Sequence, residues 1–158
     1  MKIVVFASGR GSNFKAIVEN IESGALTNVE VSLLLSNKPE ANVLAYAAEK
    51  GIPHVCVDEK QFASREAYEE AVLAEVKKVR CNLVVLAGYM KILGADFLAN
   101  VGCPVVNIHP SLLPSFPGLH AQKQAVDYGV KVSGCTVHFV DAELDHGPII
   151  AQVPVPVE

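Results

Sequence analysis

The sequence has no long hydrophobic run, no block of basic residues and no Cys-x-x-Cys pair. Its longest apolar runs, such as residues 83–87, are far shorter than the ~20 residues that span a bilayer, so we expect no membrane partner. The apolar stretch over residues 3–7 is also too short for the core of a signal peptide, which favours a cytoplasmic location. With 13 basic and 17 acidic residues, the formal net charge is -4, and we expect no nucleic-acid partner.

The cysteines are too far apart in the sequence to indicate a zinc site or a disulfide framework. They are Cys56, Cys81, Cys103 and Cys135. In a reducing compartment such cysteines behave as small buried hydrophobic residues. We therefore expect free thiols and no bound metal.

A chain of 158 residues with 51% apolar and 19% charged residues suits a globular protein, and excludes disordered and collagen-like classes. Neither an internal repeat nor a linker is visible. We expect a single domain over residues 1–158.

Apolar runs typical of strands alternate with helical patterns along the chain. Strands are predicted at residues 3–7, 29–35, 54–57, 83–87, 104–108, 132–140 and 149–155. Helices are predicted at residues 14–21 and 41–50, over residues 64–80 with Ser64 as the N-cap, and after His120. This order predicts an α/β fold with a doubly wound, mostly parallel sheet and helices on both faces.

Ligands of such sheets bind at the carboxyl ends of the strands. That rule selects residues 8–13, 88–93 and 107–118. The last of these segments is too long for a plain turn and contains Pro110, Pro114 and Pro117, so we expect it to be a functional loop.

The first candidate motif lies between a strand and a helix and reads Gly9-Arg10-Gly11-Ser12-Asn13. Free backbone N–H groups and the helix dipole at this place favour an anion such as a phosphate. A dinucleotide fingerprint is excluded because Phe14 replaces the third glycine, and a P-loop because no Gly-Lys-Ser/Thr follows. The alternative is a glycine turn with Ser12 as the helix cap.

The second candidate motif is the pair Asn107 and His109 at the end of a predicted strand. Residues two apart on a strand point to the same side, so one small group can meet both side chains. An amide donor and a protonatable imidazole suit a developing oxyanion. The alternative is a buried core histidine.

The turn over residues 141–148 is the third candidate, with three carboxylates and His146. A carboxylate beside His109 would favour and orient its imidazolium form. The spacing does not say which acid takes this place, and a solvated acidic turn is the alternative. The metal-ligand spacing of a dedicated cage is missing.

Several further residues have two interpretations. The apolar residues of the segment 88–93 belong either to the core or to a pocket for a flat heterocycle. His54 and His138 lie in strand-like runs and are interpreted as structural, His120 as a loop or capping residue, and Arg65 as a surface charge.

Taken together, the motifs resemble those of the phosphoribosylglycinamide formyltransferase family, which uses a formyl folate. The resemblance covers almost the whole chain and rests on residues 9–13, 86–90, 107–114, 117–120 and the turn that contains Asp145. It implies a Rossmann-like formyltransferase fold. It also implies transfer of a formyl group from 10-formyltetrahydrofolate to the amine of glycinamide ribonucleotide, without a metal, by a monomer or homodimer.

The resemblance assigns roles to individual residues. It implies a catalytic set of Asn107, His109 and Asp145. It places the nucleotide phosphate on Gly11, Ser12 and Asn13, and the glycinamide near Pro110. It places the folate against Arg65, Met90, Lys91, Ile92, Leu93, Asn107 and the turn that begins at Asp141.

The family's chains usually extend beyond the position of residue 158, so the resemblance implies a further C-terminal segment. Three alternatives compete with it. A formyltetrahydrofolate hydrolase ordinarily carries a preceding regulatory domain, whereas here the first strand begins at residue 3. Methionyl-tRNA formyltransferase needs a basic surface for RNA, and the third alternative is an inactive nucleotide-binding module.

Overall fold

The computed structural model describes residues 1–158. The chain divides into two compact units, Met1–Pro104 and Val105–Glu158. Each unit is described by itself below.

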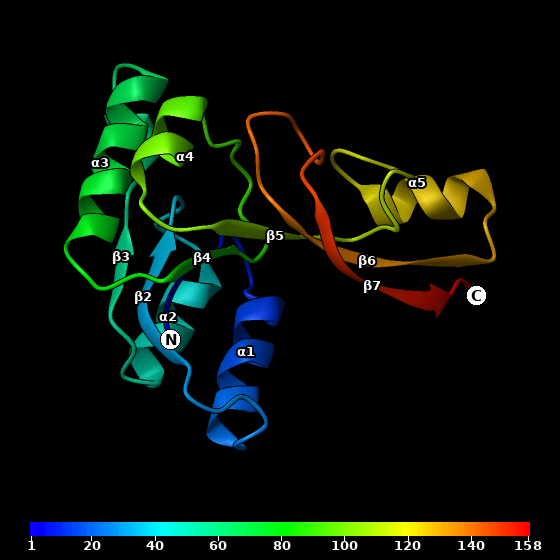
Figure 1. Ribbon diagram of the computed structural model, residues 1–158, viewed down its shortest axis with the longest axis horizontal. Helices are drawn as coiled ribbons and strands as arrows, with labels where there is room; N and C mark the ends of the chain where they lie inside the picture. The colour runs from blue at the N-terminus through cyan, green and yellow to red at the C-terminus, as the bar shows by residue number, and fades with distance from the viewer. The chain divides into compact units, whose positions relative to one another are not determined.

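The first unit contains four parallel strands in the order β3-β2-β1-β4. The strands are β1 (Lys2–Phe6), β2 (Glu30–Ser36), β3 (His54–Cys56) and β4 (Leu83–Leu86). The helices are α1 (Ser12–Glu22), α2 (Asn42–Glu49), α3 (Arg65–Lys77) and α4 (Ala95–Asn100), with a short 3-10 helix at Glu59–Gln61. Figure 1 shows α1 and α2 on one face of these strands and α3 and α4 on the other.

The core of this unit explains why its strands are apolar throughout. Val4, Val5 and Phe6 of β1 are fully buried, as expected for a strand that is covered on both faces. The ring of Phe6 makes edge-to-face contacts with Tyr89 and Phe97, with centroid distances of 5.1 and 6.2 Å. The carboxyl end of the central strand is therefore held rigidly.

The second unit is an antiparallel sheet with one helix. Its elements are β5 (Val105–His109), α5 (Ala121–Tyr128), β6 (Val132–Phe139) and β7 (Ile149–Pro156), and β6 pairs with both other strands. The proline-containing loop between β5 and α5 has a cis peptide bond at Leu113-Pro114. The turn between β6 and β7 carries Asp141 and Asp145.

All seven predicted strands are present with their ends within one residue of the prediction. The predicted N-cap is also confirmed, because the Ser64 hydroxyl accepts from the Ala67 N–H at 3.1 Å. The α/β class is confirmed, with three parallel strand pairs in the first unit and two antiparallel pairs in the second. The single domain over residues 1–158 stays a prediction.

Two details differ from the expectation. Helix α4 was not predicted, because its six residues bury only Phe97 and show no repeated apolar stripe. The four cysteines are free, but they are partly exposed rather than fully buried.

None of the helices is both long enough and apolar enough to span a bilayer.

Candidate active site

His109 is the last residue of β5, and its ring is buried, with 5% of the side chain exposed. Its Nε2 lies 2.9 Å from the carbonyl oxygen of Phe116. A carbonyl only accepts, so this nitrogen must carry a proton and donate it. The other nitrogen, Nδ1, lies 3.5 Å from Oδ1 of Asp145. Both ring nitrogens thus face oxygen acceptors, an arrangement that suits a doubly protonated imidazolium.

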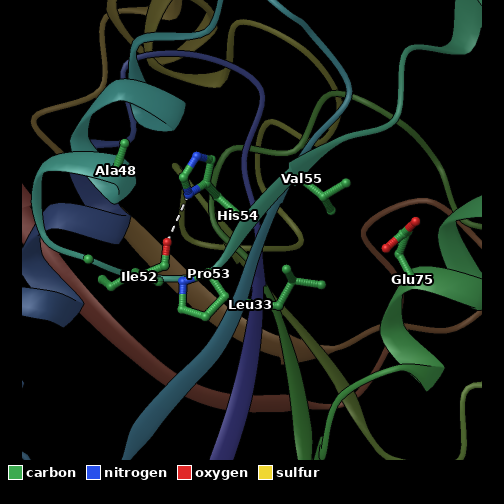
Figure 2. Close-up of a pocket in the computed structure, with 8 residues that line it drawn as sticks. Leu33, Ala48, Ile52, Pro53, His54, Val55 and Glu75 are labelled. Atoms are coloured by element: carbon green, nitrogen blue, oxygen red, sulfur yellow. Dashed lines mark hydrogen bonds between the residues drawn. The ribbon is translucent and has the colours of Figure 1, made fainter.

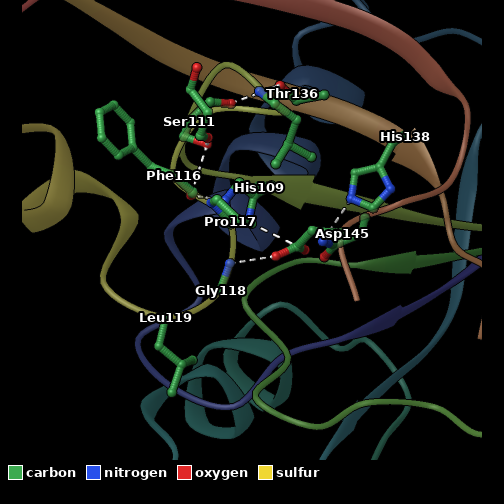
Figure 3. A network of polar contacts seen from close by, with 12 residues as sticks. His109, Ser111, Phe116, Pro117, Gly118, Leu119, Thr136, His138 and Asp145 are labelled. Atoms are coloured by element: carbon green, nitrogen blue, oxygen red, sulfur yellow. Dashed lines mark hydrogen bonds and ion pairs between the residues drawn. The ribbon is translucent and has the colours of Figure 1, made fainter. Parts of the chain in front are cut away.

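Asp145 is held against His109 by the proline-containing loop. Its other oxygen, Oδ2, accepts a hydrogen bond of 2.7 Å from the backbone N–H of Gly118, and 6% of its side chain is exposed. Its backbone has a φ of 51°, a left-handed conformation that aspartate tolerates better than most residues. Figure 3 shows the carboxylate between the Gly118 backbone and His109. The structure therefore selects Asp145 as the acid beside the histidine.

Asn107 lies two residues before His109 on β5 and contacts a second histidine. Its Nδ2 is 3.2 Å from Nε2 of His138, the residue opposite to it on β6. The Nδ1 of His138 lies 2.9 Å from the carbonyl oxygen of Phe139, so Nδ1 carries the proton and Nε2 accepts. This fixes the amide of Asn107 with its nitrogen toward the ring, which leaves one N–H and Oδ1 of Asn107 for other partners.

Thr136 fixes the proline-containing loop, and it is fully buried on β6 opposite His109. Its hydroxyl donates to the Ser111 carbonyl at 2.7 Å and accepts from the Leu113 N–H at 3.0 Å. The Ser111 hydroxyl in turn donates to the Ser115 carbonyl at 2.5 Å, and it lies 3.2 Å from the Phe116 carbonyl, the same oxygen that contacts His109. The orientation of the histidine thus depends on a buried threonine.

Sequence reasoning missed the parts played by His138 and Thr136. The interpretation of His138 as structural is incomplete, since the buried ring also contacts Asn107 directly. The signal available was the strand register: once residues 105–109 pair with residues 136–139, His138 faces Asn107 and Thr136 faces His109. That register is a long-range feature that no local pattern encodes. His54 contacts only a backbone carbonyl in its own turn, at 2.9 Å from Ile52.

The turn over residues 141–148 also carries an exposed ion-pair cluster. Nδ1 of His146 lies 3.0 Å from Asp141 and 3.4 Å from Glu143. The hydrogen bond from His146 holds the pKa of Asp141 below its usual value, and the same bond raises the pKa of His146. The two neighbouring acids of this turn thus have separate partners, Asp141 with His146 and Asp145 with His109.

In the first unit, the glycine motif forms the turn into α1. Gly11 is the N-cap with a φ of 76° and no side-chain cap, so the alternative of Ser12 as the cap is wrong. A Cβ at Gly11 would lie 2.4 Å from Cγ2 of Val43, so only glycine fits here. Ser12 and Asn13 are exposed in the first turn of the helix, where N–H groups lack helical partners.

The segment after β4 combines exposed and buried residues. Met90 and Ile92 are 54% and 52% exposed, whereas Leu93 is buried. Arg65 of α3 donates from Nη2 to the Ile92 carbonyl at 2.8 Å, and Lys91 pairs with Glu59. Arg65 is exposed, as expected for a surface charge, and it also holds this segment.

A pair of tyrosines fixes the start of the same segment. The hydroxyls of Tyr68 and Tyr89 lie 2.5 Å apart, and burial raises the pKa of both. The two phenols therefore stay neutral over the usual pH range and act as hydrogen-bonding groups.

Each unit also has a cavity, and neither cavity is formed by the predicted catalytic residues. A cavity of about 610 Å³ in the first unit is lined by β3 and its surroundings, including His54 and Glu75 (Figure 2). A cavity of about 350 Å³ in the second unit is lined by Phe116, Tyr128 and neighbouring residues. Neither contains a residue predicted for the site. No group of three or more His, Cys, Asp or Glu side chains is arranged to hold a metal ion.

The chain is similar to known proteins over its whole length. The family model described as "Formyl transferase" matches residues 1–158. The chain is 42% identical over 157 residues to "Phosphoribosylglycinamide formyltransferase" of Bacillus subtilis. The match covers 99% of this chain and 80% of that protein. A crystal structure of phosphoribosylglycinamide formyltransferase from Bacillus halodurans has a TM-score of 0.94 at 46% identity, with 100% of this chain and 81% of that chain covered.

Some relatives are much longer. The chain is 45% identical over 157 residues to "Trifunctional purine biosynthetic protein adenosine-3" of Drosophila melanogaster. The match covers 99% of this chain but only 12% of that protein. The similarity therefore concerns one part of the longer relative.

Proposed function

The chain belongs to the formyl transferase family, and we propose that it transfers the formyl group of 10-formyltetrahydrofolate to the amine of N1-(5-phosphoribosyl)glycinamide, a step of purine biosynthesis. The observation that carries the proposal is the ring of His109 between Asp145 and the Phe116 carbonyl, with Asn107 two residues away on the same strand. The relatives that carry this activity in their names, at 42–46% identity over nearly the whole chain, support it.

The reaction needs a place for negative charge. The amine of the glycinamide attacks the formyl carbon, and the formyl oxygen becomes an oxyanion in the tetrahedral intermediate. The free N–H of Asn107 and a ring N–H of His109 are the donors for that oxygen. Because Nε2 of His109 now donates to the Phe116 carbonyl, the substrate oxygen takes over that hydrogen bond. Removal of one such donor raises the activation free energy by about 2.7–4 kcal/mol.

The reaction must also move a proton. The attacking nitrogen loses one, and the leaving nitrogen of tetrahydrofolate gains one as the bond from the formyl carbon to that nitrogen breaks. Asp145 accepts a bond from Gly118 and faces His109, so we assign its carboxylate to orienting the ring and to assisting this transfer. General acid–base catalysis of this kind accelerates a reaction by roughly 10²–10⁴-fold.

The substrates are assigned to segments of each unit. The nucleotide phosphate binds the N–H groups and side chains of Gly11, Ser12 and Asn13, and the glycinamide lies near Pro110. The exposed positions of Ser12 and Asn13, and the absence of a side-chain cap, support this assignment. The residues assigned to the folate are Arg65, Met90, Lys91, Ile92, Leu93, Asn107 and Asp141.

The test is an assay of the purified chain with both substrates. Glycinamide ribonucleotide and 10-formyltetrahydrofolate are mixed with the protein, and conversion to tetrahydrofolate is followed by absorbance. We expect turnover only when the amine is present. Release of formate without the amine would favour the formyltetrahydrofolate hydrolase instead, and no turnover with either acceptor would favour the inactive nucleotide-binding module.

The proposal also includes the cytoplasm as the location and a monomer or homodimer as the active form. The chain has four free thiols, and the sulfurs of Cys81 and Cys103 lie 3.4 Å apart without a bond. Burial raises the pKa of Cys81 to about 12, so this thiol stays protonated and unreactive at neutral pH.

A further inference from the structure

Two candidate substrate segments of the first unit meet at one buried serine. Ser8 follows β1 and directly precedes the glycine motif, and it is 3% exposed. Its N–H donates to the Gly88 carbonyl at 3.0 Å, and its hydroxyl accepts from the Met90 N–H at 2.8 Å. Ser8 therefore holds the beginning of the segment 88–93 at two points while it begins the turn over residues 9–13.

The orientation of this hydroxyl is fixed by a third segment. Ser8 Oγ donates to Oδ1 of Asn37 at 2.6 Å, and Asn37 is 2% exposed at the end of β2. Because the hydroxyl proton is used on Asn37, the lone pairs of Oγ face the Met90 N–H. The bond to Asn37 is buried, where hydrogen bonds are strong, and the bond from Met90 is partly buried. The serine side chain is thus restricted to one position.

Two side chains of helix α3 also hold the segment 88–94. Arg65 of α3 donates to the Ile92 carbonyl, and Glu69 of α3 accepts from the Gly94 N–H at 2.7 Å. These contacts join the segment to a helix that is far from residues 9–13 in the sequence. Ser8 differs from them because its own backbone continues into the glycine turn, so any displacement of Ser8 moves both segments.

We propose that Ser8 is a positioning residue for both substrates: its hydroxyl sets the segment 88–93 for the formyl folate and its backbone sets the turn 9–13 for the phosphate of the acceptor. The proposal rests on the proposed function. It assigns no chemical step to Ser8, so the residue affects binding of both substrates in the ground state and the transition state alike.

The test compares KM and kcat for both substrates in Ser8→Ala. Loss of a buried hydrogen bond of this kind costs about 1 kcal/mol or more, so we expect both KM values to rise at least about fivefold. The expected kcat stays within about threefold, since uniform binding is lost rather than transition-state binding. Asn37→Ala frees the hydroxyl rotamer and should give the same pattern to a smaller extent.

Ser36→Ala is the matched control. Ser36 is fully buried at the end of β2, and its hydroxyl contacts only Lys38 within its own turn, at 3.3 and 3.4 Å. We expect it to leave both KM values within about twofold, even if it lowers stability in urea. If Ser36→Ala raises both KM values as Ser8→Ala does, the effect is general loosening and the proposal is overturned.

The outcomes separate this proposal from the proposed function. Absence of turnover in the unaltered chain contradicts the proposed function, and in that case inorganic phosphate and tetrahydrofolate serve as binding probes in calorimetry. A KM effect on one substrate only, or on neither, overturns the positioning role while the proposed function stands. If Ser8→Ala does not fold, Asn37→Ala decides by the same two KM values.

Discussion

The side-chain nitrogen of Asn107 lies 3.2 Å from Nε2 of His138, and the ring of His138 is itself fixed by the Phe139 carbonyl. Because Nδ1 of His138 donates to the Phe139 carbonyl, the ring presents Nε2 to the Asn107 amide, and the amide nitrogen donates to it. The amide of Asn107 then has one permitted orientation. An N–H that is to stabilise an oxyanion has to be held in advance in this way.

Replacement of His138 by alanine should therefore lower kcat more than it changes KM. Without the acceptor at Nε2, the Asn107 amide rotates freely and its N–H no longer points consistently at the oxyanion. We expect kcat to fall by roughly 10- to 100-fold, short of the ~10²–10³-fold loss for a donor removed outright. His54→Ala, at the other strand-like histidine, is the control and should leave kcat unchanged in the same steady-state assay.

Asp145→Asn tests the carboxylate beside His109 without removing its hydrogen bond to the loop. An asparagine oxygen still accepts from the Gly118 N–H, so the turn should keep its conformation, whereas the negative charge 3.5 Å from the ring is lost. We expect kcat to fall by roughly 10²–10⁴ with little change in the urea midpoint. Near-full activity of this variant would remove Asp145 from the mechanism.

Asp127→Asn serves as the matched control for that experiment. Asp127 is exposed on α5, and its carboxylate pairs with Lys123 one helical turn earlier. Pairs of this kind contribute ~0.3–0.5 kcal/mol to stability. Both the activity and the unfolding midpoint of this variant should match those of the unaltered chain.

The strands were predictable because each is an uninterrupted or alternating apolar run between turn residues. Helix α4 was not, because a helix of six residues with one buried side chain has no periodicity to detect. The same limit applies to the site. The candidate set of Asn107, His109 and a nearby acid followed from residue type and position, but the spacing left the acid open, and the fold of the turn brings Asp145 to 3.5 Å from the His109 ring.

The supporting residues needed the strand register. Thr136 and His138 acquire their roles because β6 runs antiparallel to β5 and places them opposite His109 and Asn107. Ser8 likewise reaches Asn37 across 29 residues and Met90 across 82 residues of sequence. Contacts of this range arise from tertiary packing, which a pattern of neighbouring residues does not contain.

The ion pair of His146 and Asp141 should make the turn around Asp145 sensitive to pH. The pKa of His146 is raised by its hydrogen bond to Asp141, so its contribution to stability is complete below the unfolded value and is lost as pH rises through the folded value. The pKa of Asp141 is lowered by the same bond, so its contribution is lost as pH falls through that lowered value. The pair is therefore complete only between these two limits.

An NMR titration of the His146 ring measures this directly. We expect its pKa above the usual value of ~6.5 in the unaltered chain and lower in Asp141→Asn, where Glu143 still raises it. An unchanged His146 titration in the variant would show that the pair does not form in solution.

Gly11→Ala separates backbone strain from steric conflict in the glycine turn. Gly11 has a φ of 76°, and its added Cβ would lie 2.4 Å from Cγ2 of Val43. Gly24→Ala is the matched comparison, because Gly24 has a similar φ of 82° but nothing within 4 Å of the added carbon. The left-handed conformation alone costs about 1–2 kcal/mol, so Gly24→Ala should lose about this amount in urea unfolding.

Gly11→Ala should lose clearly more than Gly24→Ala, and it should also weaken binding of the nucleotide, since the backbone N–H groups of the turn must shift. The double variant Gly11→Ala, Val43→Ala removes the conflict while it adds the cost of a cavity. If the conflict dominates, the loss for the double variant is smaller than the sum of the two single losses, as expected for residues in direct contact. Strict additivity in urea unfolding would show that Val43 does not restrict this turn.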